Sequence, residues 1–233
     1  MSSAASSADS GATLEGSAAT DARGICTILI PAYNEAETID GVVEVGLRSG
    51  VGEVLVVDDG STDGTGEAAR RAGARVIGLQ RNLGKGGAVA AGLRSIASET
   101  VLLVDADLVG LTPRHLQDLA APVIAGEVDM TRGVFTGGRW RTTAAQRLTP
   151  QLNGQRAVRR DLLLRVPQLE ATRYGIEVAI TDVARREGWR CRDIPLEGVS
   201  QVMKEEKRGF IAGMAMRLRM YRDIFATMLR SRR

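Results

Sequence analysis

Residues 100–108, TVLLVDADL, decide the fold of this chain. Four apolar residues, at 101–104, run without interruption into two carboxylates, Asp105 and Asp107. A continuous apolar run of this kind is typical of a strand that is buried on both faces of a parallel sheet. Ligands of such sheets bind outside the carboxyl ends of the strands, so the two carboxylates predict a binding site there.

The chain before this strand repeats the same alternation of strand and helix. Apolar runs predict three earlier strands, at 25–34, 53–63 and 74–80. Helices are expected at 35–48, at 64–72, after the Gly-rich loop within 82–97, and at 113–125, where Pro113 suits the first helical position. Successive βα units of about 25 residues imply a mostly parallel sheet with right-handed crossovers and flanking helices. We therefore predict an α/β fold.

Polar motifs follow each predicted strand and would meet at one edge of the sheet: PAYNE at 31–35, DDGSTD at 58–63, RNLGKGG at 81–87 and DADL at 105–108. Carboxylates can approach a diphosphate only with a cation between them, and hard oxygen ligands select Mg²⁺ or Mn²⁺. Asp105 and Asp107 are therefore a candidate cation site. The alternative is a capped turn before the helix at 113–125.

Two further residues of these motifs are candidates for ligand binding. Asp59 can accept hydrogen bonds from a nucleobase N–H or a ribose hydroxyl; the alternative is a turn in which Thr62 or Asp63 caps the next helix. Lys85 stands between two glycines, which let the backbone approach a ligand, and its ammonium suits a phosphate. The alternative is a flexible surface lysine.

The same motifs carry a resemblance to a known family. PAYNE, VVDDGSTDGT at 56–65, NLGKGGA at 82–88 and DADL together resemble family-2 glycosyltransferases, closely over 25–110 and more loosely as far as residue 205. RGV at 132–134, GQR at 154–156 and YGIE at 174–177 make the chain similar to the glucosyl-3-phosphoglycerate-synthase-like branch. Polyprenyl-phosphate sugar synthases are the nearby alternative branch. The resemblance implies the GT-A fold and transfer of a sugar from a nucleotide sugar.

The resemblance also implies a role for each matching residue. The nucleoside pocket would be lined by Pro31, Ala32, Tyr33 and Glu35, with Asp59 beside the base. Lys85 would meet the base or the phosphates, Asp105 with Ala106 the ribose or sugar, and Asp107 the metal. The sugar and acceptor side would comprise Arg132, Gly133, Val134, Phe135, Tyr174 and Gly175. Glu177 and Asp105 would be the catalytic carboxylates.

The residues that follow GQR predict an acceptor site of their own. Arg156, Arg159 and Arg160 could grip an anionic acceptor through charge-assisted hydrogen bonds, and the alternative is a solvated basic face. A helix at 176–187 and a strand at 190–199 would complete this side of the fold. Glu177 could then take the proton of an acceptor hydroxyl.

The metal site departs from the family at one position. In the phosphoglycerate-type branch a histidine downstream of the YGxE motif completes the metal site. The single histidine here is His115, in the helix expected at 113–125, where we expect a surface or capping role. Gln201 stands at the matching place, and its amide oxygen is a candidate ligand that is weaker than imidazole for Mn²⁺.

Composition and charge bound the organisation of the chain. With 233 residues and 44% hydrophobic content, the sequence can bury one α/β core, and we expect the GT-A domain at 24–205. Residues 1–23 are nearly devoid of large apolar side chains and are expected to be disordered. Residues 206–233 are predicted to form a basic amphipathic helix. It could contact an anionic membrane surface, pack on the domain or pair with a second subunit.

Composition also indicates which partners and which cellular compartment to expect. The net charge is only +3, and the basic residues are not interleaved with aromatics, which argues against a nucleic-acid partner. No run of about 18 apolar residues predicts a membrane-spanning helix. Cys26 and Cys191 lie far apart and are expected to be packing residues of a cytoplasmic protein.

These observations predict a metal-dependent hexosyltransferase. The expected donor is a UDP- or GDP-sugar, with UDP-glucose first, and the expected acceptor is small and anionic, such as 3-phosphoglycerate. The alternatives are a polyprenyl phosphate acceptor, a non-catalytic nucleotide-sugar binder, and a sugar-1-phosphate nucleotidylyltransferase. The last class typically carries a GxGxR loop after its first strand, where this chain has PAYNEAE. Retention or inversion at the sugar stays open.

Overall fold

The structure, a computed structural model, describes residues 24–136, 154–172 and 175–201. Its central sheet has seven strands in the order β3-β2-β1-β4-β7-β6-β8. Their bounds are β1 Cys26–Ala32, β2 Glu53–Asp58, β3 Arg75–Gly78, β4 Thr100–Leu103, β6 Met130–Thr136, β7 Arg156–Arg159 and β8 Cys191–Glu197. Only β7 runs against its neighbours β4 and β6, and the other pairs of this sheet are parallel. The predicted mostly parallel α/β fold is confirmed.

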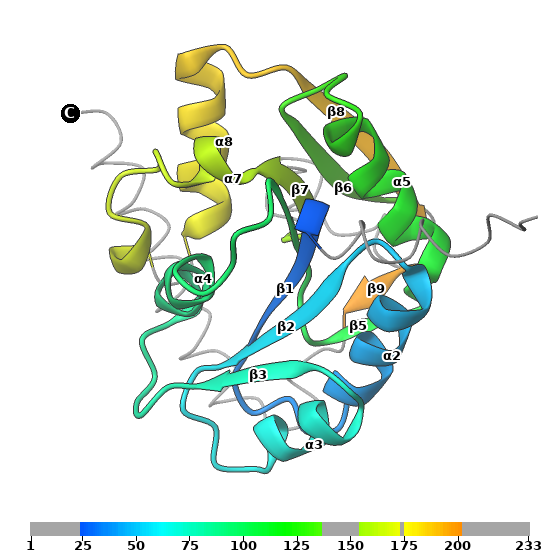
Figure 1. The fold of residues 1–233 in the computed structure, drawn as a ribbon, viewed down its shortest axis with the longest axis vertical. Coiled ribbons are helices and arrows are strands. Elements are labelled where there is room, and N and C mark those ends of the chain that lie inside the picture. Colours follow the sequence, from blue (N-terminus) through cyan, green and yellow to red (C-terminus); the bar gives the residue numbers. More distant parts are fainter. Residues whose placement is uncertain (1–23, 137–153, 173–174, 202–233) are drawn as a thin grey trace, which may run out of the picture.

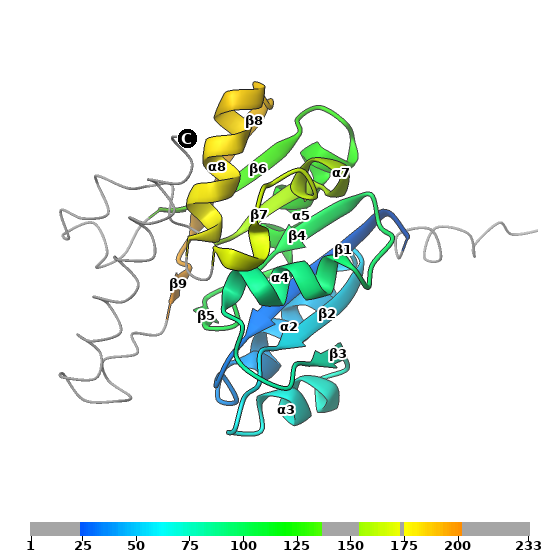
Figure 2. The ribbon, with the colours of Figure 1, turned by 90° about the vertical axis from the view of Figure 1, so that its left-hand side faces the viewer.

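Helices cover both faces of the sheet, as Figures 1 and 2 show. One face carries α2 (Ile39–Ser49), α3 (Thr65–Arg71) and α5 (Pro113–Ile124). The other carries α4 (Lys85–Leu93), α7 (Arg160–Leu163) and α8 (Ile176–Glu187), with a short 3₁₀ helix at Leu169–Ala171. Within the described ranges, no helix has the length and apolar character needed to cross a bilayer.

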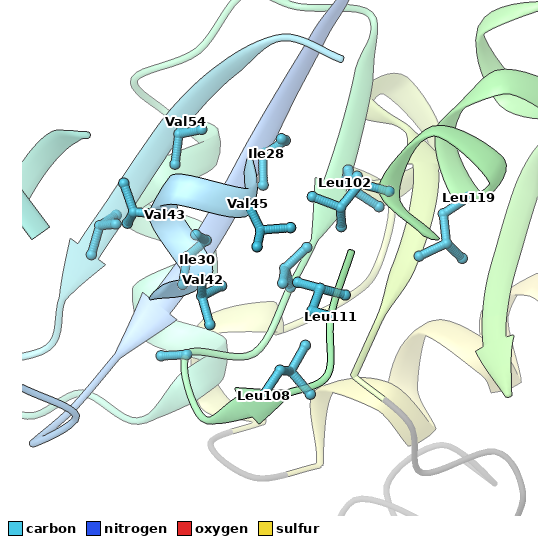
Figure 3. Packing of buried hydrophobic residues seen from close by; sticks show 14 of the residues in the cluster. Ile28, Ile30, Val42, Val43, Val45, Val54, Leu102, Leu108, Leu111 and Leu119 are labelled. Carbon is cyan, nitrogen blue, oxygen red and sulfur yellow. The ribbon is translucent and has the colours of Figure 1, made fainter. Parts of the chain in front are cut away.

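Alternate residues of each central strand supply two separate cores. Ile28, Ile30 and Leu102 face α2 and α5 (Figure 3), whereas Leu29 and Leu103 face α4 and α8. This two-sided burial is the reason for the continuous apolar run that precedes the acidic motif. Each fully buried side chain of this size stabilises the fold by roughly 1.5–3 kcal/mol.

The first two helices begin later than the sequence predicts. Residue 35 was expected to start a helix, but α2 starts at Ile39. The residue at the N-cap position of α3 is Gly64, with φ of 87°. Asp63 Oδ1 nevertheless accepts the backbone N–H of Thr65, the first residue of α3, at 3.1 Å, so of the two caps expected, Thr62 or Asp63, the structure supports Asp63. At α5 the expectation is confirmed: Pro113 is at the first turn, and His115 forms a capping box with Thr112.

A second, two-stranded sheet joins the acidic motif to the end of the described chain. β5 (Leu108–Val109) pairs antiparallel with β9 (Ser200–Gln201), which sets Gln201 opposite Leu108. Gly110 makes this approach possible, since a Cβ there would lie 2.3 Å from the carbonyl oxygen of Gly198. The pairing brings the residue predicted to replace the family's histidine beside DADL.

The two cysteines, both expected to be packing residues, differ in their burial. Cys26 is fully buried in the core, and burial raises the pKa of its thiol to about 12, so it is the packing residue that was expected. Cys191 is exposed at the start of the edge strand β8, so the packing role predicted for it is wrong. The predicted disordered segment at 1–23 and the amphipathic helix at 206–233 lie outside the described residues.

Candidate active site

The loops that follow β1 and β2 are tied to each other. Asn34, at φ of 55°, donates its backbone N–H to Ser61 Oγ at 3.0 Å and accepts from the backbone N–H of Thr62 at 3.0 Å. The N–H of Glu35 donates to Thr65 Oγ1 at 2.9 Å. These bonds fix the PAYNE segment against DDGSTD, where the nucleoside is predicted to bind.

The structure places the predicted nucleoside residues at this tied pair of loops. Pro31 and Ala32 end β1 in register with Val57 and Asp58 of β2. Tyr33 is 37% exposed, a surface position from which a ring could stack on a base, while Glu35 is buried. Contact of any of these residues with a nucleoside stays a prediction.

Asp59 orders the Gly-rich loop that leads into α4. Its two carboxylate oxygens accept the backbone N–H groups of Leu83 at 2.7 Å and Gly84 at 2.8 Å, and its side chain is buried. Gly84 has φ of 84°, a left-handed value that favours glycine. The carboxylate predicted to lie beside the base thus positions the loop that precedes Lys85.

Lys85 is the first residue of α4 and bridges two carboxylates. Its ammonium donates to Asp105 Oδ1 at 2.5 Å and to Glu177 Oε1. The three side chains come from the start of α4, the end of β4 and the first turn of α8. Burial opposes the positive charge, but the two carboxylates outweigh it and raise the pKa of Lys85. The alternative of a flexible surface lysine is therefore wrong.

Asp105 is held by further donors. Burial acts to raise the pKa of Asp105, but Lys85 and the hydrogen bond from Gln155 outweigh it, so the pKa is lowered. Gln155 Nε2 donates to Asp105 Oδ2 at 2.8 Å, and Gln201 Nε2 donates to the same oxygen at 2.7 Å. In the sequence, Gln155 stands out only as the middle residue of the GQR motif, which gives it no role of its own.

Arg156 lies beneath the first turn of α8. Its side chain is fully buried, and Nη1 donates to the carbonyl oxygen of Glu177 at 3.2 Å and to Thr181 Oγ1 at 3.4 Å. The guanidinium therefore supports the turn that carries Glu177. A direct grip on an acceptor stays a prediction that this burial does not favour.

The other predicted acceptor residues are divided between the two ends of the sheet. Arg132 pairs with Asp193 of the neighbouring strand at 2.8 Å, and Gly133 and Val134 follow it in β6. Arg159 pairs with Thr100 at the start of β4, and Arg160 begins α7 beside it, so both lie at the end of the strands away from Asp105. The acceptor role considered for them is wrong on this geometry. Gly175 is the N-cap residue of α8, and Tyr174 lies outside the described residues.

The carboxylate oxygens of the DADL motif are the type of ligand that a hard divalent cation prefers. Asp107 is half-buried two residues beyond Asp105, and carboxylate oxygens suit Mg²⁺ or Mn²⁺. Among the residues that the structure describes, no three His, Cys, Asp or Glu side chains gather as a metal-binding group. A site with few protein ligands leaves coordination positions for the oxygens of a phosphate.

Comparisons with known proteins agree with this arrangement of motifs. The sequence profile described as "Glycosyl transferase family 2" matches residues 27–184. Glucosyl-3-phosphoglycerate synthase of Mycobacterium tuberculosis is 31% identical over 192 residues, which cover 66% of this chain and 59% of that protein. The chain thus spans 59% of the length of that relative.

Shorter matches reach other transferases. Glycosyltransferase AglJ of Haloferax volcanii is 48% identical over 81 residues, covering 34% of this chain and 26% of that protein. Undecaprenyl-phosphate 4-deoxy-4-formamido-L-arabinose transferase of Edwardsiella ictaluri is 36% identical over 93 residues, covering 35% of this chain and 29% of that protein.

Solved structures extend the likeness over most of the fold. A crystal structure of the Mycobacterium tuberculosis glucosyl-3-phosphoglycerate synthase in complex with Mn²⁺, UDP and phosphoglyceric acid matches with a TM-score of 0.73 at 26% identity. The match covers 92% of this chain and 80% of that chain. Another crystal structure of the same enzyme contains Mg²⁺ and UDP.

Proposed function

Because the chain belongs to glycosyl transferase family 2, we propose that it transfers a hexose from a nucleotide sugar to a small anionic acceptor. UDP-glucose is the first candidate donor and 3-phosphoglycerate the first candidate acceptor. The relative at 31% identity is named glucosyl-3-phosphoglycerate synthase, and its solved complexes with Mn²⁺, UDP and phosphoglyceric acid support this choice.

One observation carries the proposal: the ammonium of Lys85 joins Asp105 to Glu177. Lys85 is separated from Asp105 by 20 positions in the sequence and from Glu177 by 92. Only the folded sheet therefore brings the Gly-rich loop, the DADL motif and the YGIE motif together. A buried cation between two carboxylates is costly to assemble, and such clusters of perturbed groups gather at functional sites.

The geometry supports a division of labour along the edge of the sheet. The tied loops after β1 and β2 would hold the nucleoside, and Asp59 would keep the Gly-rich loop in place for the phosphates. Lys85 would donate to the donor's base or phosphates from the start of α4. Asp107 would hold Mg²⁺ or Mn²⁺, which would neutralise the negative charge on the departing nucleoside diphosphate.

Glu177 would act on the transferred sugar and the acceptor. Its carboxylate is buried and faces Lys85, and Arg156 fixes the turn that carries it. With a hydroxyl acceptor, Glu177 could accept the proton as the new glycosidic bond forms. With an ionised phosphate acceptor no base is needed, and Glu177 would orient the sugar.

The test is release of the nucleoside diphosphate in the presence of Mn²⁺, UDP from UDP-sugars and GDP from GDP-sugars, measured with and without 3-phosphoglycerate. We expect acceptor-dependent release with one sugar nucleotide, loss of the signal with a chelator, and a glycosylated product by mass spectrometry. Tight binding of the nucleotide sugar without turnover on any acceptor would show a binding protein instead. Release of pyrophosphate from a sugar-1-phosphate and a nucleoside triphosphate would show a nucleotidylyltransferase.

A polyprenyl phosphate is the second candidate acceptor. The 36% identity to an undecaprenyl-phosphate transferase over 93 residues favours it, although that match covers only 35% of the chain. Vesicles that contain undecaprenyl phosphate form the second arm of the assay, beside 3-phosphoglycerate in solution. Sugar transfer to the lipid alone would replace the first candidate by the second. Membrane contact or dimer formation through residues 206–233 and a cytoplasmic location stay predictions.

A further inference from the structure

The carboxylate of Asp105 is surrounded by three N–H donors from distant parts of the chain. Oδ1 accepts from Lys85 at 2.5 Å. Oδ2 accepts from Gln155 Nε2 at 2.8 Å and from Gln201 Nε2 at 2.7 Å. The side chain of Asp105 is only 13% exposed, so the protein itself meets most of its hydrogen-bonding capacity.

The chemistry of the groups fixes which way each amide faces. An ionised carboxylate can only accept hydrogen bonds, so the NH₂ group of each glutamine must turn toward Asp105. The carbonyl oxygens of Gln155 and Gln201 therefore turn away from that carboxylate. Gln201 meets the acidic motif through its nitrogen, which cannot ligate a cation.

The backbone places both glutamines for this contact. A Cβ at Gly154 would lie 2.5 Å from both oxygens of Asp105 and 2.6 Å from Lys85 Nζ, so only glycine lets the segment before β7 approach so closely. On the other side, the β5–β9 pairing sets Gln201 in register with Leu108. The glycine at 154 and the β5–β9 pairing thus place the two amides independently beside Asp105 Oδ2.

Gln155 carries an unfavourable feature that its contact with Asp105 explains. The residue is fully buried, and its Oε1 has no hydrogen-bond partner among the residues that the structure describes. A buried amide oxygen without a partner destabilises a fold, and an apolar side chain at that place would avoid this cost. The glutamine is therefore needed for its nitrogen.

We propose that Gln155 and Gln201 are positioning residues that clamp Asp105 Oδ2, so that Asp105 faces the sugar donor and Asp107 carries the cation. The proposal deepens the proposed function and rests on it. Ligation of a cation through Oδ2 would require one of the two amides to leave. The clamp therefore assigns different tasks to the two carboxylates of DADL, and it gives Gln201 a role other than that of the histidine it replaces.

Substitution by methionine tests the clamp, because methionine keeps the length of glutamine and removes both N–H donors. The variants are Gln155→Met, Gln201→Met and the double variant. Gln117→Met is the matched control, since Gln117 Nε2 donates at 3.0 Å to the carbonyl oxygen of Ser49 at the far end of α2. Two quantities are measured: the affinity for Mn²⁺ in the UDP complex, and the affinity and KM for the nucleotide sugar at saturating Mn²⁺.

Loss of a hydrogen bond to a charged group predicts about a tenfold weaker affinity for the nucleotide sugar in each site variant. The affinity for Mn²⁺ should stay within about twofold, and Gln117→Met should match the wild type in both measurements. The double variant should lose less than the product of the single losses, because both amides act through one carboxylate. Gln201→His restores an N–H donor and should recover the sugar-nucleotide affinity.

Two results would overturn the clamp. A tenfold loss of Mn²⁺ affinity in Gln201→Met would make Gln201 a metal ligand. Unchanged affinity for the nucleotide sugar in folded Gln201→Met would show that the amide does nothing for the donor, and this variant decides even if Gln155→Met fails to fold. If the wild type transfers no sugar, the proposed function fails, while calorimetry of the nucleotide sugar and Mn²⁺ still tests the clamp.

Discussion

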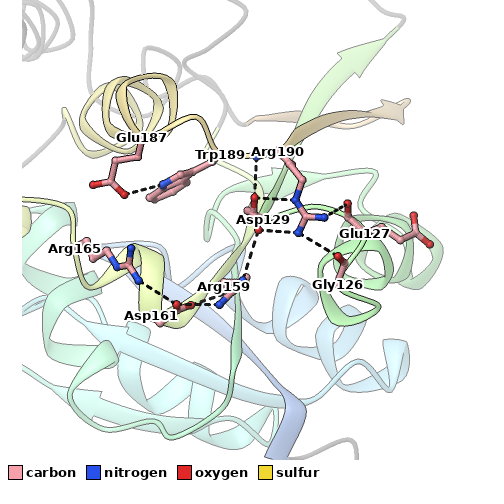
Figure 4. Close-up of polar contacts among 9 residues, drawn as sticks. All are labelled: Gly126, Glu127, Asp129, Arg159, Asp161, Arg165, Glu187, Trp189 and Arg190. Atoms are coloured by element: carbon pink, nitrogen blue, oxygen red, sulfur yellow. Dashed lines mark hydrogen bonds and ion pairs between the residues drawn. The ribbon is translucent and has the colours of Figure 1, made fainter.

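The two ends of the central sheet both gather charged side chains, yet they arrange them in opposite ways. At the amino ends of β6 and β8, Arg190 donates to both oxygens of Asp129, at 3.1 and 3.0 Å, and to the carbonyl oxygens of Gly126 and Glu127 (Figure 4). The side chain of Arg190 is 56% exposed. At the carboxyl ends, Lys85 is 21% exposed and Glu177 9% exposed.

The difference shows at which end of the sheet the fold retains polar groups that are costly to bury. At the amino end Arg190 and Arg159, 56% and 46% exposed, meet the carboxylate of Asp129, which is 15% exposed. Because the arginines keep much of their contact with water, these pairs tie strands together at little cost. At the carboxyl end the ammonium of Lys85 serves two largely buried carboxylates, and Gln155 Oε1 has no partner within the described part of the chain. Costly polar groups that a fold nevertheless retains indicate function, so the two ends should respond differently to substitution.

Asp107→Ala, at the carboxyl end, should have the largest effect on sugar transfer and none on stability. Without the proposed metal ligand, we expect transfer to fall on the order of a thousandfold at unchanged melting temperature, as for loss of a group that stabilises a developing charge. Initial rates with Mn²⁺ and a thermal melt measure both. Asp118→Ala is the control, since Asp118 pairs with Arg114 on the exposed side of α5. Full activity of Asp107→Ala in the presence of chelator would contradict the metal assignment.

Gly154→Ala should have the next largest effect, again at the carboxyl end. The new Cβ would meet both oxygens of Asp105 at 2.5 Å, so the carboxylate and Lys85 must move apart. Misplaced catalytic groups commonly cost about a hundredfold in rate, and we expect a loss of that order in kcat/KM. Gly41→Ala in α2 is the control, because a Cβ there meets nothing within 4 Å. Equal activity of the two variants would mean that the clamped geometry is not needed for the reaction.

The sequence predicted the carboxyl end well and the amino end hardly at all. Asp59, Lys85 and Asp107 follow apolar strands, so the rule that strand ends converge was sufficient to group them. The role of Gln155 was not predicted, because it depends on β7 running antiparallel beside β4, a pairing that no local pattern encodes. Arg159 was misplaced for the same reason, since the reversed strand carries it to the opposite end.

The network around Asp129 in Figure 4 depends on pairings of this kind too. Asp129 and Arg190 are 61 residues apart and meet because β6 and β8 are parallel neighbours. Single charged residues outside an apolar run give no sign of such a partner. Sequence patterns thus locate groups that local structure delivers to an edge, and they miss those that depend on long-range strand order.

Asp129→Ala should reverse the pattern of the first two variants. It removes the acceptor that joins β6 to Arg190, so we expect the melting temperature to fall by about 3–6 °C. Sugar transfer should stay within about twofold of the wild type, because the pair lies at the end of the strands away from Asp105. A thermal melt and an initial-rate assay on the same sample give both numbers. A loss of activity larger than the loss of folded protein would show that the two ends are coupled.

The smallest effect concerns how the same pair responds to pH. The hydrogen bond and charge of Arg190 outweigh burial and hold the pKa of Asp129 below its ordinary value of 3.8. A lowered carboxyl pKa contributes stability that is present above the unfolded value and is lost as pH falls through the folded value. The difference in melting temperature between wild type and Asp129→Asn should therefore be constant from about pH 5 to 7 and shrink below about pH 4. A difference that persists undiminished at pH 2.5 would show that the contact does not depend on the ionised carboxylate, and that the amino end stabilises the sheet by packing alone.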